Sequence, residues 1–217
     1  METLDTCRVS ADIPGVARLP APALLLIVAA VASGTALAAQ PKPLPLNARL
    51  IAHGEFAGFG PFGPAHVQTF RTARAWVGGN TQLTPTQVSN AVAALHREGF
   101  VAAAAEQLGS LKRYRGGLSW VTELGSPAKA RAEVARTIAI TRAAGYPFAP
   151  FKVIGVPGAV AYRAGTSSQG GDNVLFADGR FAYLVGDGWS TGGTPARPAL
   201  IAAVQSLYER VHGHPAA

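Results

Sequence analysis

Two aspartates that bracket a predicted β-hairpin are the groups in this sequence best placed for acid–base chemistry. Asp172 and Asp187 lie just outside the segment Asn173–Val185, so they come close together if the two halves of that segment pair. Two carboxylates at neighbouring strand ends can hold a cation or act as an acid–base pair. The simpler interpretation is that each bonds to its own backbone where the chain enters and leaves a loop, so no catalytic residue is predicted.

Two histidines and a glutamate supply the ingredients of a hydrolase site. His53 and Glu55 precede a phenylalanine-rich segment and His66 closes it, so a serine from 166–168 would complete a triad. The segment 165–169 is not G-x-S-x-G, because Gln169 occupies the last position. A hydrolase of envelope material that uses His53, Glu55 or the two aspartates is therefore kept as the alternative function.

Metal and cofactor motifs give no further candidate. His212 and His214 resemble a chelating pair, but they stand at the end of the chain, where tails fray. No H-E-x-x-H motif and no Cys/His spacing accompanies them, and the sequence has neither a P-loop nor a dinucleotide fingerprint. No metal and no cofactor is predicted.

Three phenylalanines form the first candidate binding surface. Phe56, Phe59 and Phe62 stand at every third position of the segment 53–66, among glycines and prolines whose density excludes a regular helix. They would form a hydrophobic lip for a ligand, or they would fold back to cover an open face of the sheet.

A basic loop is the second candidate surface. The predicted hairpin loop 109–117 carries four residues suited to contact with phosphate or an anionic wall polymer, although solvated charge is the simpler interpretation: Lys112, Arg113, Tyr114 and Arg115. Residues 39–217 hold 17 basic and 9 acidic side chains, a formal charge of +8. Such a domain is attracted to anionic surfaces, and export argues against nucleic acid as the partner.

Residues 1–38 have the layout of a secretory signal peptide. Arg18 precedes the apolar run 23–32, which small residues follow before Ala36-Leu37-Ala38, an A-x-A cleavage site. If the signal is not cleaved, the uncharged stretch would anchor the chain through residues 19–39. Whether the signal is cleaved or kept as an anchor, residues 39–217 are expected outside the membrane. They consist of a proline-rich tether (39–47) and one domain (48–217). Because the sole cysteine, Cys7, lies in the leader, that domain has no disulfide.

The domain is organised around the segment 173–185, NVLFADGRFAYLV. Asp178-Gly179 between alternating apolar residues predicts a two-residue hairpin loop. With these two residues at the tip, Phe176 faces Phe181, and both faces of the ribbon are apolar. The hairpin must therefore lie inside a larger sheet that is covered on both sides.

The remaining pattern predicts an α+β domain, a mostly antiparallel sheet with about three packed helices. Thr84-Pro85 and Ser126-Pro127 open two helices, with Glu98 and Glu133 expected on their surfaces, and a third begins at Thr194 or Arg197. Strands are expected at 48–52, 67–76, 100–108, 118–124, 151–154 and 159–163. This order of elements resembles that of PsbP-like extracytoplasmic domains in layout only.

These observations together predict a non-catalytic, secreted or envelope-associated domain that binds an apolar or anionic envelope component. The partner would be an envelope lipid or an anionic wall polymer. A structural or partner-docking module is the third possibility.

Overall fold

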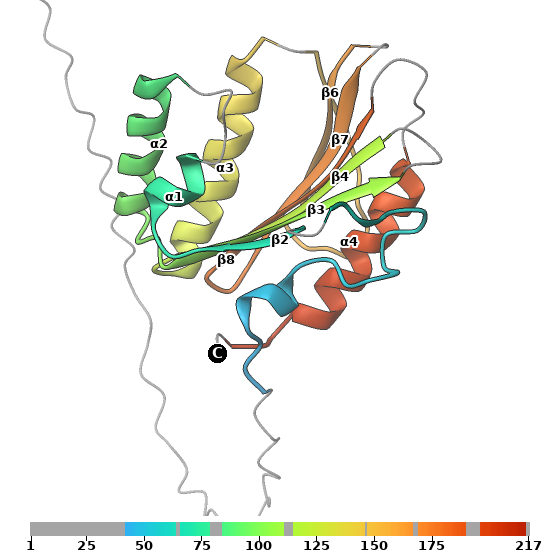
Figure 1. Cartoon of the computed structure of the whole chain (residues 1–217), viewed down its shortest axis with the longest axis horizontal. Coiled ribbons are helices and arrows are strands. Elements are labelled where there is room, and N and C mark those ends of the chain that lie inside the picture. Colours follow the sequence, from blue (N-terminus) through green and yellow to red (C-terminus); the bar gives the residue numbers. More distant parts are fainter. Residues whose placement is uncertain are drawn as a thin grey trace, which may run out of the picture. The chain divides into compact units, whose positions relative to one another are not determined.

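The computed structural model describes residues 42–63, 66–78, 84–110, 115–145, 147–166, 169–189 and 196–215. Within these residues, eight strands form one antiparallel sheet in the order β1-β3-β4-β8-β7-β6-β5, with β2 also paired to β3. The elements are η1 (a 3₁₀ helix, Leu46–Arg49), β1 (Gly60–Pro61), β2 (Val67–Phe70), α1 (Ala73–Gly78), α2 (Pro85–Arg97), β3 (Ala102–Ser110), β4 (Arg115–Glu123), α3 (Pro127–Ala143), β5 (Phe148–Phe151), β6 (Val160–Gly165), β7 (Gly170–Asp178), β8 (Phe181–Trp189) and α4 (Arg197–Val211). The predicted α+β class is confirmed (Figure 1).

The hairpin β7–β8 lies in the middle of the sheet, between β4 and β6, as its two apolar faces required. Its loop is Gly179–Arg180, one residue later than predicted, because Asp178 stays in the strand and pairs with Phe181. The loop glycine takes a φ of 53°, which the tight turn requires. Phe176 therefore pairs with Tyr183 rather than with Phe181. Since this slip changes the pairing by two residues, every side chain keeps its predicted face.

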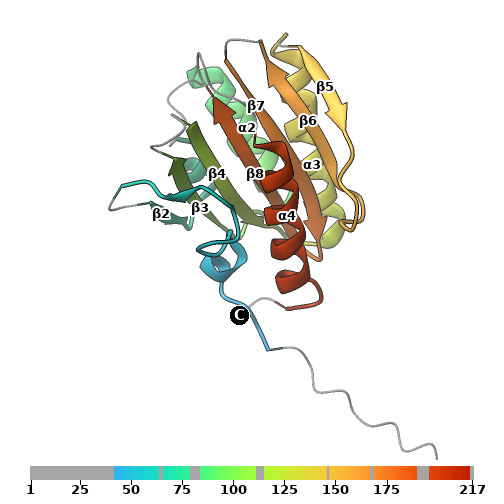
Figure 2. The same ribbon diagram turned by 90° about the vertical axis from the view of Figure 1, so that its right-hand side faces the viewer.

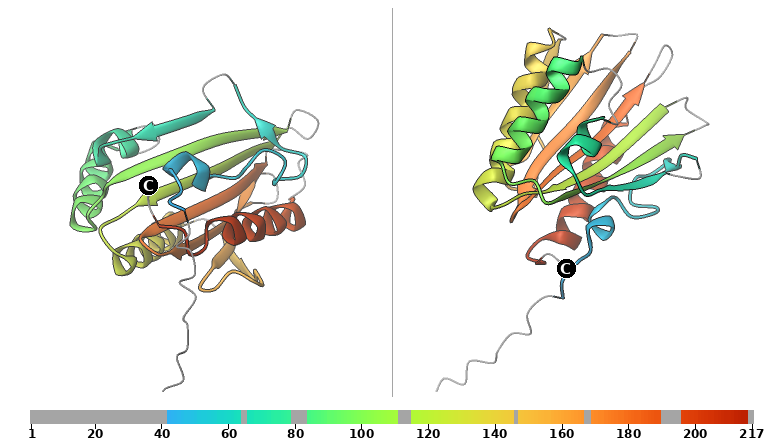
Figure 3. Two further views of the ribbon diagram at one scale, coloured as in Figure 1. Left: turned by 90° about the horizontal axis from the view of Figure 1, so that it is seen from below. Right: turned by 60° about the vertical axis from the view of Figure 1, so that its left-hand side comes forward.

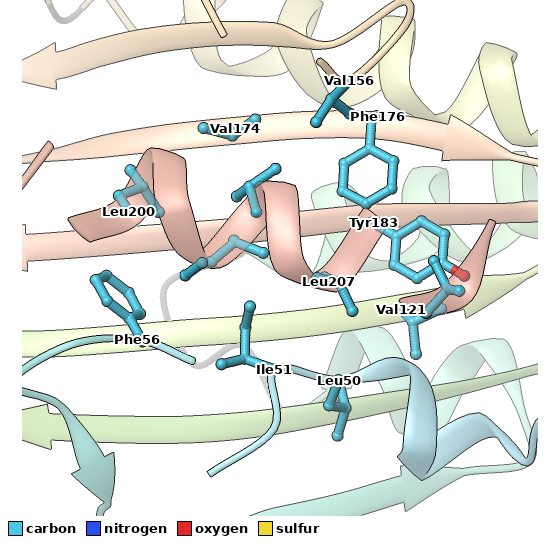
Figure 4. Close-up of a cluster of buried hydrophobic side chains, with 14 of the residues drawn as sticks. Leu50, Ile51, Phe56, Val121, Val156, Val174, Phe176, Tyr183, Leu200 and Leu207 are labelled. Atoms are coloured by element: carbon cyan, nitrogen blue, oxygen red, sulfur yellow. The ribbon is translucent and has the colours of Figure 1, made fainter. Parts of the chain in front are cut away.

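Helix α4 covers one face of the sheet, where it lies across β7 and β8 (Figure 2). The core on this face combines strand side chains with the inner stripe of α4 and with residues that precede β1, which Figure 4 shows in close-up. Its members include Leu50, Ile51, Phe56, Val121, Val174, Phe176, Tyr183, Leu200 and Leu207.

Helices α1, α2 and α3 supply the core of the opposite face (right-hand panel of Figure 3). Here the alternate residues of the hairpin, Leu175, Ala182 and Leu184, meet the inner residues of α3. Burying apolar side chains on both faces of one sheet adds to the free energy of unfolding, by roughly 25 cal/mol per Å² of apolar area removed from water. The sheet is thus the middle layer of the domain.

The two predicted helix starts are confirmed at the level of the caps. The Thr84 side chain accepts a hydrogen bond from Gln87 N, and the Gln87 side chain accepts one from Thr84 N, which completes a capping box. The Ser126 side chain accepts a bond from Lys129 N, and a proline follows each cap. Helix α4 differs, because its first position has no side-chain cap from its own segment.

Several local expectations were wrong. The segment 48–52, predicted as a strand, contains the end of η1 and a coil, and 67–76 divides into the short strand β2 and the start of α1. The strand expected at 151–154 lies earlier, as β5, and the loop expected at 109–117 is shorter, because β3 runs to Ser110 and β4 begins at Arg115. Glu98 and Glu133, expected on helix surfaces, are both buried, with 9% of each residue exposed. In both helices the packing of a neighbouring element covers a face that the sequence pattern leaves polar.

A buried arginine fixes the two ends of the described chain to each other. Arg49, wholly buried, donates to the carbonyls of His214 (2.7 Å) and Pro215 (2.6 Å) and to the hydroxyl of Tyr183 (3.1 Å). Burial raises the pKa of Tyr183 to about 12, so its hydroxyl stays neutral at physiological pH. The guanidinium carbon of Arg49 also lies over the ring of Phe181, 3.8 Å from its centre. This contact network holds the end of η1 against the C-terminal end of the described chain.

Residues 40–217 form one compact unit by themselves. The predicted signal or anchor (1–38) lies outside the described residues and stays a prediction, as does the boundary of the tether. In the described part of the chain, none of the helices has the length and apolar character that a membrane crossing requires.

Candidate functional site

The two aspartates meet at the end of the sheet opposite the hairpin loop. Asp172 of β7 and Asp187 of β8 are directly opposed in the register, and two rows further towards the strand ends Gly170 pairs with Trp189. Both carboxylates lie on the α4 face, and their side chains are 0% exposed. Two directly opposed like charges destabilise a sheet unless they are neutralised, so their partners decide the character of the site.

Asp187 joins the sheet to the start of α4. Its Oδ2 forms an ion pair with Nη2 of Arg115, a residue of β4 whose side chain is 1% exposed. The same oxygen accepts a hydrogen bond from Ala196 N at 2.8 Å, at the N-terminus of α4. The cap that α4 lacks in its own segment therefore comes from the sheet, and a carboxylate there also suits the helix dipole.

Asp172 is held by two arginines at once. Arg163 of β6 donates through Nε and Nη2 to its two oxygens (2.9 and 3.3 Å), and Arg197 of α4 does the same (3.0 and 3.2 Å). Burial by itself would raise the pKa of Asp172, but the hydrogen bonds and charges of the two arginines outweigh it and lower the pKa below its ordinary value. Asp172 is therefore ionised at physiological pH.

Each of these arginines lies over an aromatic ring. The guanidinium carbon of Arg163 is 5.1 Å from the centre of the Trp189 ring, and that of Arg197 is 4.1 Å from the Phe151 ring. Glycine at position 170 makes room for the indole, because a Cβ there would lie 2.9 Å from Trp189 Cζ2. The rings and the carboxylate together fix where both guanidinium groups point.

These five residues, Arg115, Arg163, Asp172, Asp187 and Arg197, are called the Arg–Asp cluster below. The cluster carries three positive charges against two negative ones, an excess of one positive charge. Its carboxylates are covered, whereas 37% of the Arg163 side chain and 35% of the Arg197 side chain are exposed. The surface of the cluster therefore presents guanidinium groups to solvent and no carboxylate.

The two predicted binding surfaces have different positions in the structure. Phe56 and Phe59 stack on each other at 4.1 Å and are 2% and 8% exposed in the core of the α4 face. Phe62 alone of the three is exposed, at 56%. Lys112, Arg113 and Tyr114 lie outside the described residues, and Arg115 is buried in the Arg–Asp cluster. Arg115 was predicted to lie in an exposed loop, but it is buried and pairs with Asp187 inside the domain.

Of the acids in the hydrolase alternative, Glu55 does not meet the two aspartates. Glu55 accepts two hydrogen bonds from Arg210 (2.9 and 2.8 Å), near the C-terminal end of α4, whereas Asp172 binds Arg197 at its start. The two arginines are thirteen positions apart in α4, roughly 20 Å at 1.5 Å per residue. Glu55 is therefore far from Asp172 and Asp187, which lie together, and each of the three acids is already paired with arginine.

The histidines also make separate contacts. His66 Nδ1 lies 3.2 Å from Gly63 O, His212 Nδ1 lies 2.8 Å from Asp178 Oδ1, and His214 Nδ1 lies 2.8 Å from Lys42 O. Ser167 and Ser168 lie outside the described residues. Among the residues that the structure does describe, no group of three or more His, Cys, Asp and Glu side chains is arranged to hold a metal ion.

A second buried acidic pair lies between α2 and α3, away from the cluster. Arg136 bonds to Glu133 (Nε to Oε2, 2.9 Å) and forms a longer ion pair with Glu98 at 3.5 Å. Burial raises the pKa of Glu133 to about 8; the charge of Arg136 opposes this rise and Glu98 adds to it. One arginine cannot neutralise two buried carboxylates, so the pair keeps a proton at neutral pH.

Sequence reasoning found Asp172 and Asp187 but missed Arg163 and Arg197. A charged residue at the end of the apolar strand segment 159–163 was the available signal for Arg163. Its partner could be identified only from the register of β6 against β7, which places Arg163 opposite Asp172. Arg197 gave no such signal, because its role depends on where α4 lies on the sheet.

Comparison with known proteins adds a weak similarity of fold. No protein-family model matches the chain, and no curated protein matches it. A solved structure that it resembles is the extracellular domain of PknH from Mycobacterium tuberculosis, with a TM-score of 0.45 and 13% sequence identity over 77% of this chain and 98% of that one. These values do not identify a function.

Proposed function

We propose that this chain is an exported, non-catalytic domain that binds an anionic component of the cell envelope through the exposed side of the Arg–Asp cluster. Export is supported by the leader layout of residues 1–38, which leaves open whether the leader is cleaved or kept as an anchor.

The observation that carries the proposal is the way in which the cluster divides its charges between interior and surface. Both carboxylates are fully covered, while the side chains of Arg163 and Arg197 remain about one third exposed. An anion that approaches this end of the sheet meets hydrogen-bond donors and a net positive charge. Arginine in this arrangement suits phosphate and carboxylate groups because its planar fork can donate two parallel bonds.

The paired state of the acids supports a binding role over a hydrolytic one. A general base or nucleophile must be able to reach substrate, yet Asp172, Asp187 and Glu55 each accept bonds from a neighbouring arginine inside the domain. Because Phe56 and Phe59 are buried, Phe62 is the one of the three phenylalanines that offers apolar surface to a ligand. An anionic ligand is therefore the partner class that the described surface supports.

Co-sedimentation with vesicles tests this function. Residues 40–217 are mixed with vesicles of a zwitterionic lipid alone and with vesicles that also contain an anionic phospholipid. We expect retention on the anionic vesicles at low salt, a decline as salt is raised, and no retention on the zwitterionic ones. Equal retention on both vesicles, or none on either at low salt, would contradict the proposal.

A further inference from the structure

The guanidinium groups of Arg163 and Arg197 have donors that the domain does not use. Each guanidinium carries five N–H groups, and both residues direct Nε and Nη2 at Asp172. Neither Nη1 donates a hydrogen bond to another residue in the described part of the chain. Because both side chains are partly exposed, these donors are accessible from solvent.

The electrostatics at this point favour a second anion. Two positive groups share a single carboxylate, Asp172, and the other carboxylate of the cluster, Asp187, is taken by Arg115 and the start of α4. Like charges held together by one counter-charge repel each other, so an added anion that contacts both arginines relieves this repulsion. The rings of Trp189 and Phe151 already hold the guanidinium groups in place, which reduces the entropy lost on binding.

We propose that Arg163 and Arg197 form a binding site for a tetrahedral oxyanion of the phosphate class, with Asp172 as the internal carboxylate that holds the two side chains in position. This inference rests on the proposed function and names its ligand chemistry. A phosphate group presents three acceptor oxygens and more negative charge than a carboxylate, so it can bond to both arginines while Asp172 keeps its own bonds. The group can come from a lipid headgroup or from a soluble phosphate.

The test measures how much inorganic phosphate raises the unfolding temperature of residues 40–217, compared with chloride at equal ionic strength. Phosphate is expected to raise it for the wild type and for the control Arg97→Gln/Arg131→Gln, which removes two exposed arginines from α2 and α3. The variant Arg163→Gln/Arg197→Gln is expected to lose the increase. An equal increase in this variant and in the control would overturn the proposal.

Asp172→Asn separates binding from structure. The substitution raises the excess charge of the cluster from one to two, so it should destabilise the domain without phosphate and yet increase the stabilisation that phosphate gives. A purely structural Asp172 predicts the first effect without the second, and that result would refute the site. Should the double glutamine variant fail to fold, Arg163→Lys keeps the charge but loses the planar fork, and we expect it to bind phosphate about tenfold more weakly. Unchanged affinity in Arg163→Lys would also count against the site.

Vesicles identify the source of the phosphate group. Binding to vesicles that contain a phosphomonoester lipid, with weak binding of free phosphate, assigns the site to a headgroup, and the reverse assigns it to a soluble ligand. Vesicle retention that is the same in Arg163→Gln/Arg197→Gln and in the control would leave binding to an anionic envelope component standing, but would remove the Arg–Asp cluster as its site. Failure of the wild type to bind any anionic vesicle would instead remove the function.

Discussion

Removing the charge of Asp187 is expected to destabilise the domain strongly. Asp187→Asn keeps the size of the side chain and an oxygen for Ala196 N, so the main change is the loss of the counter-charge for Arg115. That arginine side chain is 1% exposed and cannot recover its hydration in the folded state. Leaving one partner of a buried ion pair without its counter-charge costs about 3–5 kcal/mol.

The effect is large enough to measure in a domain of this size. A loss of about 4 kcal/mol should lower the unfolding temperature by roughly 10 °C and should shift the urea midpoint without changing the slope. Glu209→Gln is the matched control, because it makes the same acid-to-amide change at an exposed position of α4 and should stay within about 0.5 kcal/mol of the wild type.

A double variant tests the reason for the loss. Arg115→Met/Asp187→Leu removes both charges and replaces them with apolar groups, so it should be more stable than Asp187→Asn alone, although α4 loses its cap. If the double variant is the less stable of the two, or if Asp187→Asn costs less than about 1 kcal/mol, then loss of the negative charge beside buried Arg115 is not what destabilises the single variant.

Further predictions concern the phenylalanines, the buried acids and the chain end. Phe59→Asp should unfold the domain or lower its melting temperature sharply, whereas Phe62→Asp should leave it nearly unchanged in the same thermal scan. The pKa of Glu133 is raised, so its contribution to stability is complete below about 4.5 and is lost as pH rises towards about 8. Glu133→Gln should therefore remove a decline of up to roughly 5 kcal/mol in the free energy of unfolding, measured with urea, between these pH values. Deleting residues 214–217 removes two carbonyls that accept from Arg49 and should cost about 2 kcal/mol by urea unfolding; no loss would show that this contact is not stabilising.

The hairpin shows what the sequence could specify and where its information ended. Alternation of apolar residues around Asp178-Gly179 was enough to place both strands, both faces and the position of the hairpin inside the sheet. The loop was one residue out, because Asp178 stays paired with Phe181 and the loop begins at Gly179, whose φ is 53°. Local pattern thus fixes the face of a side chain more reliably than its partner.

The candidate site shows a different limit. The nearness of Asp172 and Asp187 followed from the hairpin, since both residues flank it, but what neutralises them could not be predicted from that hairpin alone. Arg163 reaches Asp172 through the β6–β7 register, and Arg197 reaches it only because α4 packs across the sheet. Burial of Glu133 has the same origin, because a tertiary contact covers a helix face whose residues are polar in type.

The opposed aspartates and the cationic surface have one physical cause. Two carboxylates at directly paired positions in a buried part of a sheet would repel each other, so the fold is stable only with arginines beside them. Two arginines would balance two carboxylates, and the chain supplies three, of which the two that share Asp172 are the exposed ones. The surplus charge therefore faces solvent instead of lying in the interior, where an unpaired charge would be costly. Stability and anion binding depend on the same side chains for this reason. Asp172→Asn separates the two properties, because it should lower the stability of the domain and strengthen its binding of an anion.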